Sequence, residues 1–210
     1  MGNVQAVVGL SAVGAAFGWA LSQPARRLAR DSRPGVLRPG ALAMATAALF
    51  AVAIWRVPDL VAFAVAAAVV LAGVPLAALD LAERRLPTPL VGLLATAVLV
   101  VILIDGLRRG DAAPALRAVA GMMTAVVFYF AVVLLSGSLG AGDVRLAGAL
   151  GLALAWHSWP TFIYGNLLGL ALAAIAGLAV MALRHQGRHA RLPLGPALIA
   201  GALIVLLTAT

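Results

Sequence analysis

The chain has 210 residues, of which 64% are hydrophobic and only 10% are charged, and its mean hydropathy is +1.09. This composition excludes an ordinary soluble domain and predicts an integral membrane protein. The net charge is +8 and all fifteen basic residues are arginine, a pattern that indicates cytoplasmic loops of a membrane protein, so we expect no nucleic-acid partner.

Apolar segments of about twenty residues, the length an α-helix needs to cross a bilayer, dominate the sequence. We expect an all-α polytopic protein with about eight transmembrane helices. The expected helices cover residues 4–22, 39–55, 58–79, 88–104, 114–136, 144–158, 160–183 and 194–209. We divide the chain into an N-terminal pair of helices with a basic loop, residues 1–57, and a larger membrane domain, residues 58–210.

The first apolar segment has no arginine before it, whereas PARRLARDSRPGVLR follows it. This charge order is opposite to that of a cleaved signal peptide and predicts a helix that enters the membrane with its amino terminus outside. Over all eight expected helices, eleven arginines fall on one face and four on the other. The positive-inside rule places the eleven-arginine face in the cytoplasm.

Two carboxylates occur at the ends of apolar segments. Asp143 begins an apolar helix in SGSLGAGDVRLAGALG, behind Gly140 and Gly142, and Asp80 ends another in ALDLAERRLPTPL. A carboxylate near hydrocarbon is expensive to hold, so each is a candidate functional residue. An even number of helices separates the two aspartates, which places both on the cytoplasmic face.

Two nearby carboxylates can hydrolyse a peptide bond if one is ionised and the other is protonated, because close carboxylates share a proton. Simpler alternatives stay open for each. Asp143 could only cap its helix as the N-cap residue. Asp80 could be a helix-end charge paired with Arg84, four residues on, and Glu83 is interpreted as a solvated loop charge.

DLAERRLPTPL followed by GAGDVRLAGALG resembles the paired signatures of the type IV prepilin peptidases, membrane aspartic proteases of the Gly-x-Gly-Asp class. RLPLGPALIAGALI resembles the family segment before the last helix. The resemblance covers roughly residues 58 to 205. The positions that match the two signatures are Asp80, Arg85, Leu86, Pro87, Gly140, Gly142 and Asp143.

The sequence departs from the family pattern at two signature positions: Thr88 replaces asparagine after the proline, and Arg145 replaces lysine. Bifunctional relatives also carry a cysteine-containing cytoplasmic insertion with methyltransferase activity. This chain has no cysteine and about fifteen loop residues there. The resemblance therefore implies a short, peptidase-only member that needs no cofactor.

The resemblance implies an aspartic endopeptidase of the bacterial inner membrane that removes the basic leader of prepilins or pseudopilins at the cytoplasmic face. The substrate's apolar segment would stay in the lipid bilayer. The positive end of a helix dipole favours ionised Asp143, whereas a helix carboxyl terminus disfavours ionised Asp80. We therefore expect Asp143 to be the base and Asp80 the acid.

Two other classes of function stay open. One is a transporter that uses the carboxylates as a proton or cation relay, although a relay is expected to place its acids deep within helices. The other is an inactive family member that serves as an assembly factor for a pilus or secretion machine. We expect no metal site, because His185 and His189 lie among arginines and His157 is expected on the outer face.

Several residues within the apolar segments are interpreted as packing residues. Gly165 and Gly169 are expected at helix contacts, where small residues let backbones approach. Tyr129 is interpreted as a helix-packing or lipid-facing residue. The sequence does not indicate an oligomeric state.

Overall fold

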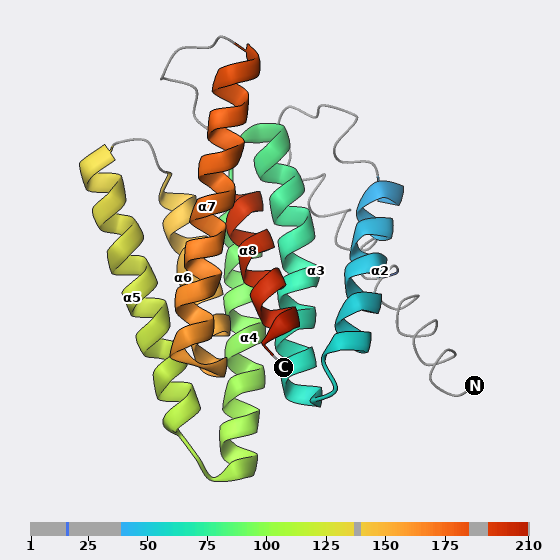
Figure 1. Cartoon of the computed structure of the whole chain (residues 1–210). Coiled ribbons are helices and arrows are strands. Elements are labelled where there is room, and N and C mark those ends of the chain that lie inside the picture. The colour runs from blue at the N-terminus through green and yellow to red at the C-terminus, as the bar shows by residue number, and fades with distance from the viewer. Residues whose placement is uncertain (1–15, 17–38, 137–139, 185–192, 210) are drawn as a thin grey trace.

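The computed structural model describes residues 16, 39–136, 140–184 and 193–209, and these residues form helices and short connections without a strand. Figure 1 shows the helices packed side by side as a bundle. Their bounds are α2 Pro39–Arg56, α3 Leu60–Glu83, α4 Thr88–Arg109, α5 Ala113–Ser136, α6 Ala141–His157, α7 Trp159–Arg184 and α8 Gly195–Thr208. The all-α prediction is confirmed; the first expected helix, residues 4–22, lies outside the described residues except for Ala16.

Four helices are long and apolar enough to cross a membrane, which supports an integral membrane protein. They are Leu60–Glu83, Thr88–Arg109, Ala113–Leu135 and Trp159–Val180. The helices α2 and α8 are apolar but shorter, and α6 has 17 residues. The expected total of about eight membrane spans is therefore supported for four helices only.

The most extensive helix contact in the described part joins α5 and α6, and it is built on glycine. A Cβ atom added to Gly121 would lie 2.2 Å from the Cβ of Ala155, and one added to Gly151 would lie 2.9 Å from the carbonyl oxygen of Gly121. Larger side chains would separate the two backbones. Small residues therefore set the position of α6 relative to α5.

The contact between α7 and α8 follows the same rule. A Cβ atom on Gly201 would lie 2.9 Å from the carbonyl oxygen of Gly165, and one on Gly169 would lie 3.0 Å from Cδ2 of Leu198. Gly165 also faces α6, where its Cβ would lie 2.7 Å from Leu154. The prediction that Gly165 and Gly169 are helix contact points is confirmed.

The helix α3 ends four residues later than expected, and this changes the setting of Asp80. The helix begins after Asp59, whose side chain accepts a hydrogen bond from the Ala62 N–H at 2.8 Å. It ends at Arg84, which has a φ of 54° and donates its backbone N–H to the carbonyl of Asp80 at 2.8 Å. A left-handed residue at this place is a common helix stop. Asp80 therefore lies within the last turn of α3.

Candidate active site

The Asp80 side chain is enclosed between α3 and α8. It is 4% exposed, and its Oδ2 accepts a hydrogen bond from the backbone N–H of Gly195 at 2.9 Å. The N-cap residue of α8, Leu194, has no side chain that could accept this bond. Asp80 thus caps α8 from another helix, where the helix dipole favours a negative charge. The alternative that Asp80 is a helix-end charge paired with Arg84 is wrong, because the Asp80 carboxylate is buried against Gly195 and no ion pair joins it to Arg84 in the described part of the chain.

Asp143 lies in the first turn of α6 and is half-buried. Its Oδ2 accepts a hydrogen bond from the Gly140 N–H, and its own N–H donates to the Gly140 carbonyl, both at 3.0 Å. Gly140 is the N-cap residue, so the alternative that Asp143 itself is the N-cap is wrong by three positions. Asp143 instead forms the reciprocal half of a capping box. Burial raises the pKa of Asp143 above the ordinary carboxyl value, and the Gly140 hydrogen bond opposes this rise.

The structure brings Asp80 and Asp143 together at one end of the bundle. The carboxyl end of α3 and the amino end of α6 lie at the same end in Figure 1, and the two helices are in contact. The charge of Asp143 acts on the Asp80 carboxyl group. Residues 63 positions apart in the sequence therefore form a candidate carboxylate pair.

Leu86, in the turn between α3 and α4, connects the segments that hold the two aspartates. Its Cβ lies 3.0 Å from where a Cβ of Gly142 would be, and its Cδ2 lies 3.4 Å from the corresponding position on Gly195. Leu86 thus packs against glycines beside both Asp143 and Asp80. These glycines allow the leucine to approach the backbone closely.

The remaining signature residues lie around this turn. Arg85 is exposed, and Pro87 is the N-cap residue of α4. Arg145 extends from α6 to α4, where its Nη1 donates to the Oγ1 of Thr88 at 2.9 Å. The two positions that depart from the family pattern are therefore hydrogen-bonded to each other.

Two residues near the aspartates were not identified as site residues from the sequence. Gly195 could have been found, because it lies in the PLGP segment of the family resemblance. Tyr129 was interpreted as a packing residue, yet it is 1% exposed and its hydroxyl has no hydrogen-bond partner among the described residues. The charge of Asp143 also acts on Tyr129.

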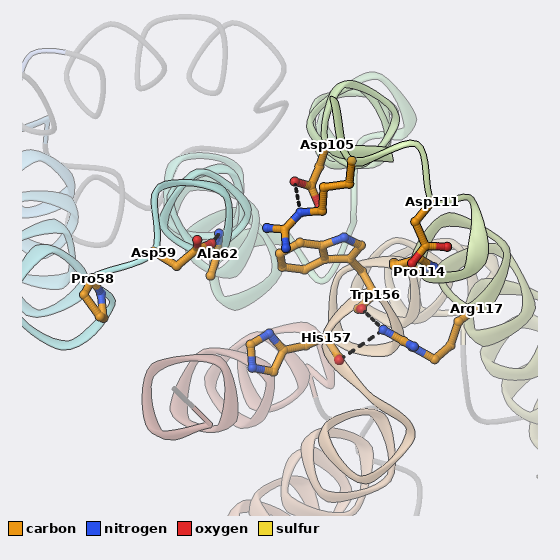
Figure 2. Close-up of a pocket in the computed structure, with 10 residues that line it drawn as sticks. Pro58, Asp59, Ala62, Asp105, Asp111, Pro114, Arg117, Trp156 and His157 are labelled. Atoms are coloured by element: carbon orange, nitrogen blue, oxygen red, sulfur yellow. Dashed lines mark hydrogen bonds and ion pairs between the residues drawn. The ribbon is translucent and has the colours of Figure 1, made fainter. Parts of the chain in front are cut away.

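A pocket of about 460 Å³ lies at the end of the bundle opposite the aspartates, and Figure 2 shows the charged side chains among the residues that line it. Its charged groups are held by the protein itself: Arg109 Nε donates to Asp105 Oδ1 at 2.7 Å, and Arg117 donates to the carbonyls at the carboxyl end of α6. The Arg117 bonds satisfy backbone carbonyls at the end of α6. The pocket is lined by Pro58, Asp59, Ala62, Asp105, Arg109, Asp111, Pro114, Arg117, Trp156 and His157.

His157, the histidine that the structure describes, lies away from the candidate site. His157 ends α6, at the end of this helix away from Asp143, and its Nε2 lies 3.0 Å from the carbonyl oxygen of Ala209. His185 and His189 lie outside the described residues. Within the described part of the chain, no three His, Asp or Glu residues form a group that could hold a metal ion.

Residues 67–183 match the model of the type IV leader peptidase family, and this region includes both aspartates. The chain is 34% identical over 132 residues to a prepilin leader peptidase/N-methyltransferase of Aeromonas salmonicida and 33% identical over 132 residues to one of Aeromonas hydrophila. Each alignment covers 61% of this chain and 44% of the relative. The chain thus matches less than half the length of these relatives. No solved structure matches it significantly.

Proposed function

Because the chain belongs to the type IV leader peptidase family, we propose that it is a membrane aspartic endopeptidase that cleaves prepilins or pseudopilins through Asp80 and Asp143. The observation that carries this proposal is the pairing of the two carboxylates. They come from two helices, α3 and α6, that are in contact, and both lie at the same end of the bundle. Such a pair can hold one proton and activate one water molecule.

In the proposed mechanism, ionised Asp143 takes a proton from the attacking water while protonated Asp80 polarises the scissile carbonyl. The half-buried Asp143 is accessible to water, whereas Asp80 is 4% exposed. The helix-dipole argument for Asp80 as the acid is weakened, because its carboxylate also faces the amino end of α8. The assignment therefore rests on the difference in access to water.

We assign the aspartate end of the bundle to the cytoplasmic face of the inner membrane, following the arginine distribution. A substrate with an apolar segment could then remain in the bilayer while its basic leader reaches the aspartates. The domain proposed to carry this activity is residues 58–210, with residues 1–57 as an N-terminal addition. The proposal concerns peptidase activity only and includes no cofactor or methyl transfer.

The placement of the aspartates bears on the transporter alternative. Asp80 lies in the last turn of α3 and Asp143 in the first turn of α6. Acids that relay ions are expected nearer the middle of the membrane. The placement favours a protease over a relay. Only an activity measurement can distinguish a protease from an inactive assembly factor.

The experiment is cleavage of a co-expressed type IV prepilin of Aeromonas hydrophila in membranes, with the prepilin leader peptidase/N-methyltransferase of that organism as a positive control. We expect the native chain to shorten the prepilin, and Asp80→Asn or Asp143→Asn to abolish this at equal membrane abundance. Glu83→Gln is the matched control at the same end of the bundle and should retain cleavage. Cleavage that survives either aspartate change would contradict the assigned pair.

A further inference from the structure

The contact between α5 and α6 brings Tyr129 to the level of Asp143. The helices run antiparallel: Gly121 faces Gly151, and further along α5 a Cβ on Gly148 would lie 2.7 Å from Cγ2 of Val126. Continuing this register for one more turn of α5 reaches Tyr129 and the first turn of α6. The backbone packing therefore fixes which α5 side chain lies beside Asp143.

Tyr129 belongs to the α5 row that is buried against α6. Gly121, Ala125 and Tyr129 are spaced by four residues, and Ala125 and Tyr129 are each 1% exposed. The phenol ring fills the interface, but its hydroxyl has no hydrogen-bond partner among the described residues. A buried hydroxyl without a partner is unfavourable, so phenylalanine would suit a position that served packing alone.

Asp143, at the start of α6, is the charged group whose electrostatic influence reaches this hydroxyl. The Oδ2 of Asp143 accepts from Gly140, which leaves the second carboxylate oxygen able to accept another bond. From α3, Asp80 presents a further carboxylate to Asp143. The Arg145 guanidinium, on α6 itself, is bonded to Thr88.

We propose that Tyr129 is a positioning residue for Asp143: when Asp143 is ionised, the Tyr129 hydroxyl donates a hydrogen bond to its carboxylate and holds it toward the attacking water. The catalytic part of this inference rests on the function proposed above. The hydrogen bond itself can be tested without a substrate.

The first test is an infrared titration of carboxyl groups in the full chain reconstituted in lipid vesicles. Asp143→Asn identifies the Asp143 band. In Tyr129→Phe the titration midpoint of Asp143 should move upward, because the ionised form loses a hydrogen-bond donor. The exposed Tyr164, on α7, provides the matched control, and Tyr164→Phe should leave the midpoint unchanged. An unchanged midpoint in Tyr129→Phe overturns the proposal.

The second test compares cleavage and stability in the same variants. Tyr129→Phe should lower kcat for the Aeromonas hydrophila prepilin by about tenfold or more with little change in KM, as expected for loss of a hydrogen bond to a charged group. Its thermal stability should be equal or higher below the Asp143 titration midpoint, where the hydroxyl has no partner, and lower above it, where the hydrogen bond to the carboxylate is lost. Unchanged kcat together with unchanged stability would show a packing role and overturn the catalytic part. If the native chain cuts no prepilin, the proposed function fails. The infrared titration still shows whether Tyr129 donates a hydrogen bond to Asp143.

Discussion

The Asp80 carboxylate accepts the backbone N–H of Gly195 at 2.9 Å, although 115 residues separate them in the sequence. This bond ties the last turn of α3 to the first turn of α8. It satisfies an amide at the start of α8 that no local side chain caps. The residue proposed as the catalytic acid is thus also held in place by a helix terminus.

The close approach of Gly195 to Asp80 predicts a strong effect of a single methyl group. A Cβ on Gly195 would lie 2.8 Å from Oδ2 of Asp80 and 3.3 Å from its Cγ. Gly195→Ala should therefore displace the carboxyl group and reduce prepilin cleavage by about a hundredfold, a typical penalty for a misplaced catalytic group. The measurement is initial cleavage rate at equal protein abundance.

Gly92→Ala is the matched control, because nothing lies within 4 Å of a Cβ at that position on α4. It should leave the cleavage rate within about twofold of the native rate, since substitutions that disturb no packing have small effects. Equal rates for Gly195→Ala and Gly92→Ala would show that the Asp80 position does not matter.

The raised pKa of Asp143 predicts how stability depends on pH. The folded protein holds the Asp143 proton to a higher pH than the unfolded chain does, so this group lowers stability as pH rises from the ordinary carboxyl pKa through the raised one. Asp143→Asn removes the charge while an amide oxygen can still accept from Gly140. At neutral pH this variant should unfold at the same or a higher temperature than the native chain, yet be inactive.

The raised pKa of Asp143 also predicts the pH below which the cleavage rate falls, if Asp143 is the base as proposed. Asp143 must be ionised to act as the base, so cleavage should fall as pH is lowered through its raised pKa, above the range of an ordinary aspartate. A rate profile of the native chain measures this limb. A cleavage rate that falls only near the ordinary carboxyl pKa would argue against Asp143 as the base.

The hydrogen bond between Arg145 and Thr88 predicts coupling between the two positions that depart from the family pattern. The contact is exposed, so a double-mutant cycle with Thr88→Ala and Arg145→Ala should give a coupling energy below about 1 kcal/mol. Thermal unfolding in detergent provides the values. Strictly additive effects of the two changes would contradict a contribution of this hydrogen bond to stability.

Arg117 is predicted to contribute to stability at the end of the bundle away from the aspartates. It donates to the carbonyls of Ala155, Trp156 and His157, which otherwise end α6 without partners. Arg117→Met should lower the free energy of unfolding by about 2 kcal/mol. The exposed Arg108 is the control, and Arg108→Met should change it by less than about 0.5 kcal/mol.

Much of the helical fold could be predicted because apolar length and charge interruptions are local features of the sequence. The seven expected helices within residues 39–209 agree with the observed ones to within five residues at each end, the largest difference being the end of α4, expected at residue 104 and observed at Arg109. The end of α3 was missed because Leu81 and Ala82 continue the helix past the charge of Asp80, and only the left-handed Arg84 stops it. A backbone conformation of this kind leaves no clear sequence signal.

The sequence predicted which carboxylates form the candidate site, but it did not predict the residues that contact them. Asp80 and Asp143 stand out because each is an acid beside an apolar helix. The hydrogen bond of Asp80 to Gly195 and the approach of Tyr129 to Asp143 depend on how α8 and α5 pack, which the spacing of residues along one helix cannot specify. The contact of Arg145 with Thr88 is equally a product of tertiary packing.

The central claim is that Asp80 and Asp143 act as one catalytic unit. It is tested most directly by single-turnover cleavage of a purified prepilin by the reconstituted full chain, with Asp80→Asn, Asp143→Asn and the double variant. Groups that act as a unit have non-additive effects, so each single change should abolish cleavage as completely as the double change. Residual activity in one single variant that falls further in the double variant would contradict the claim.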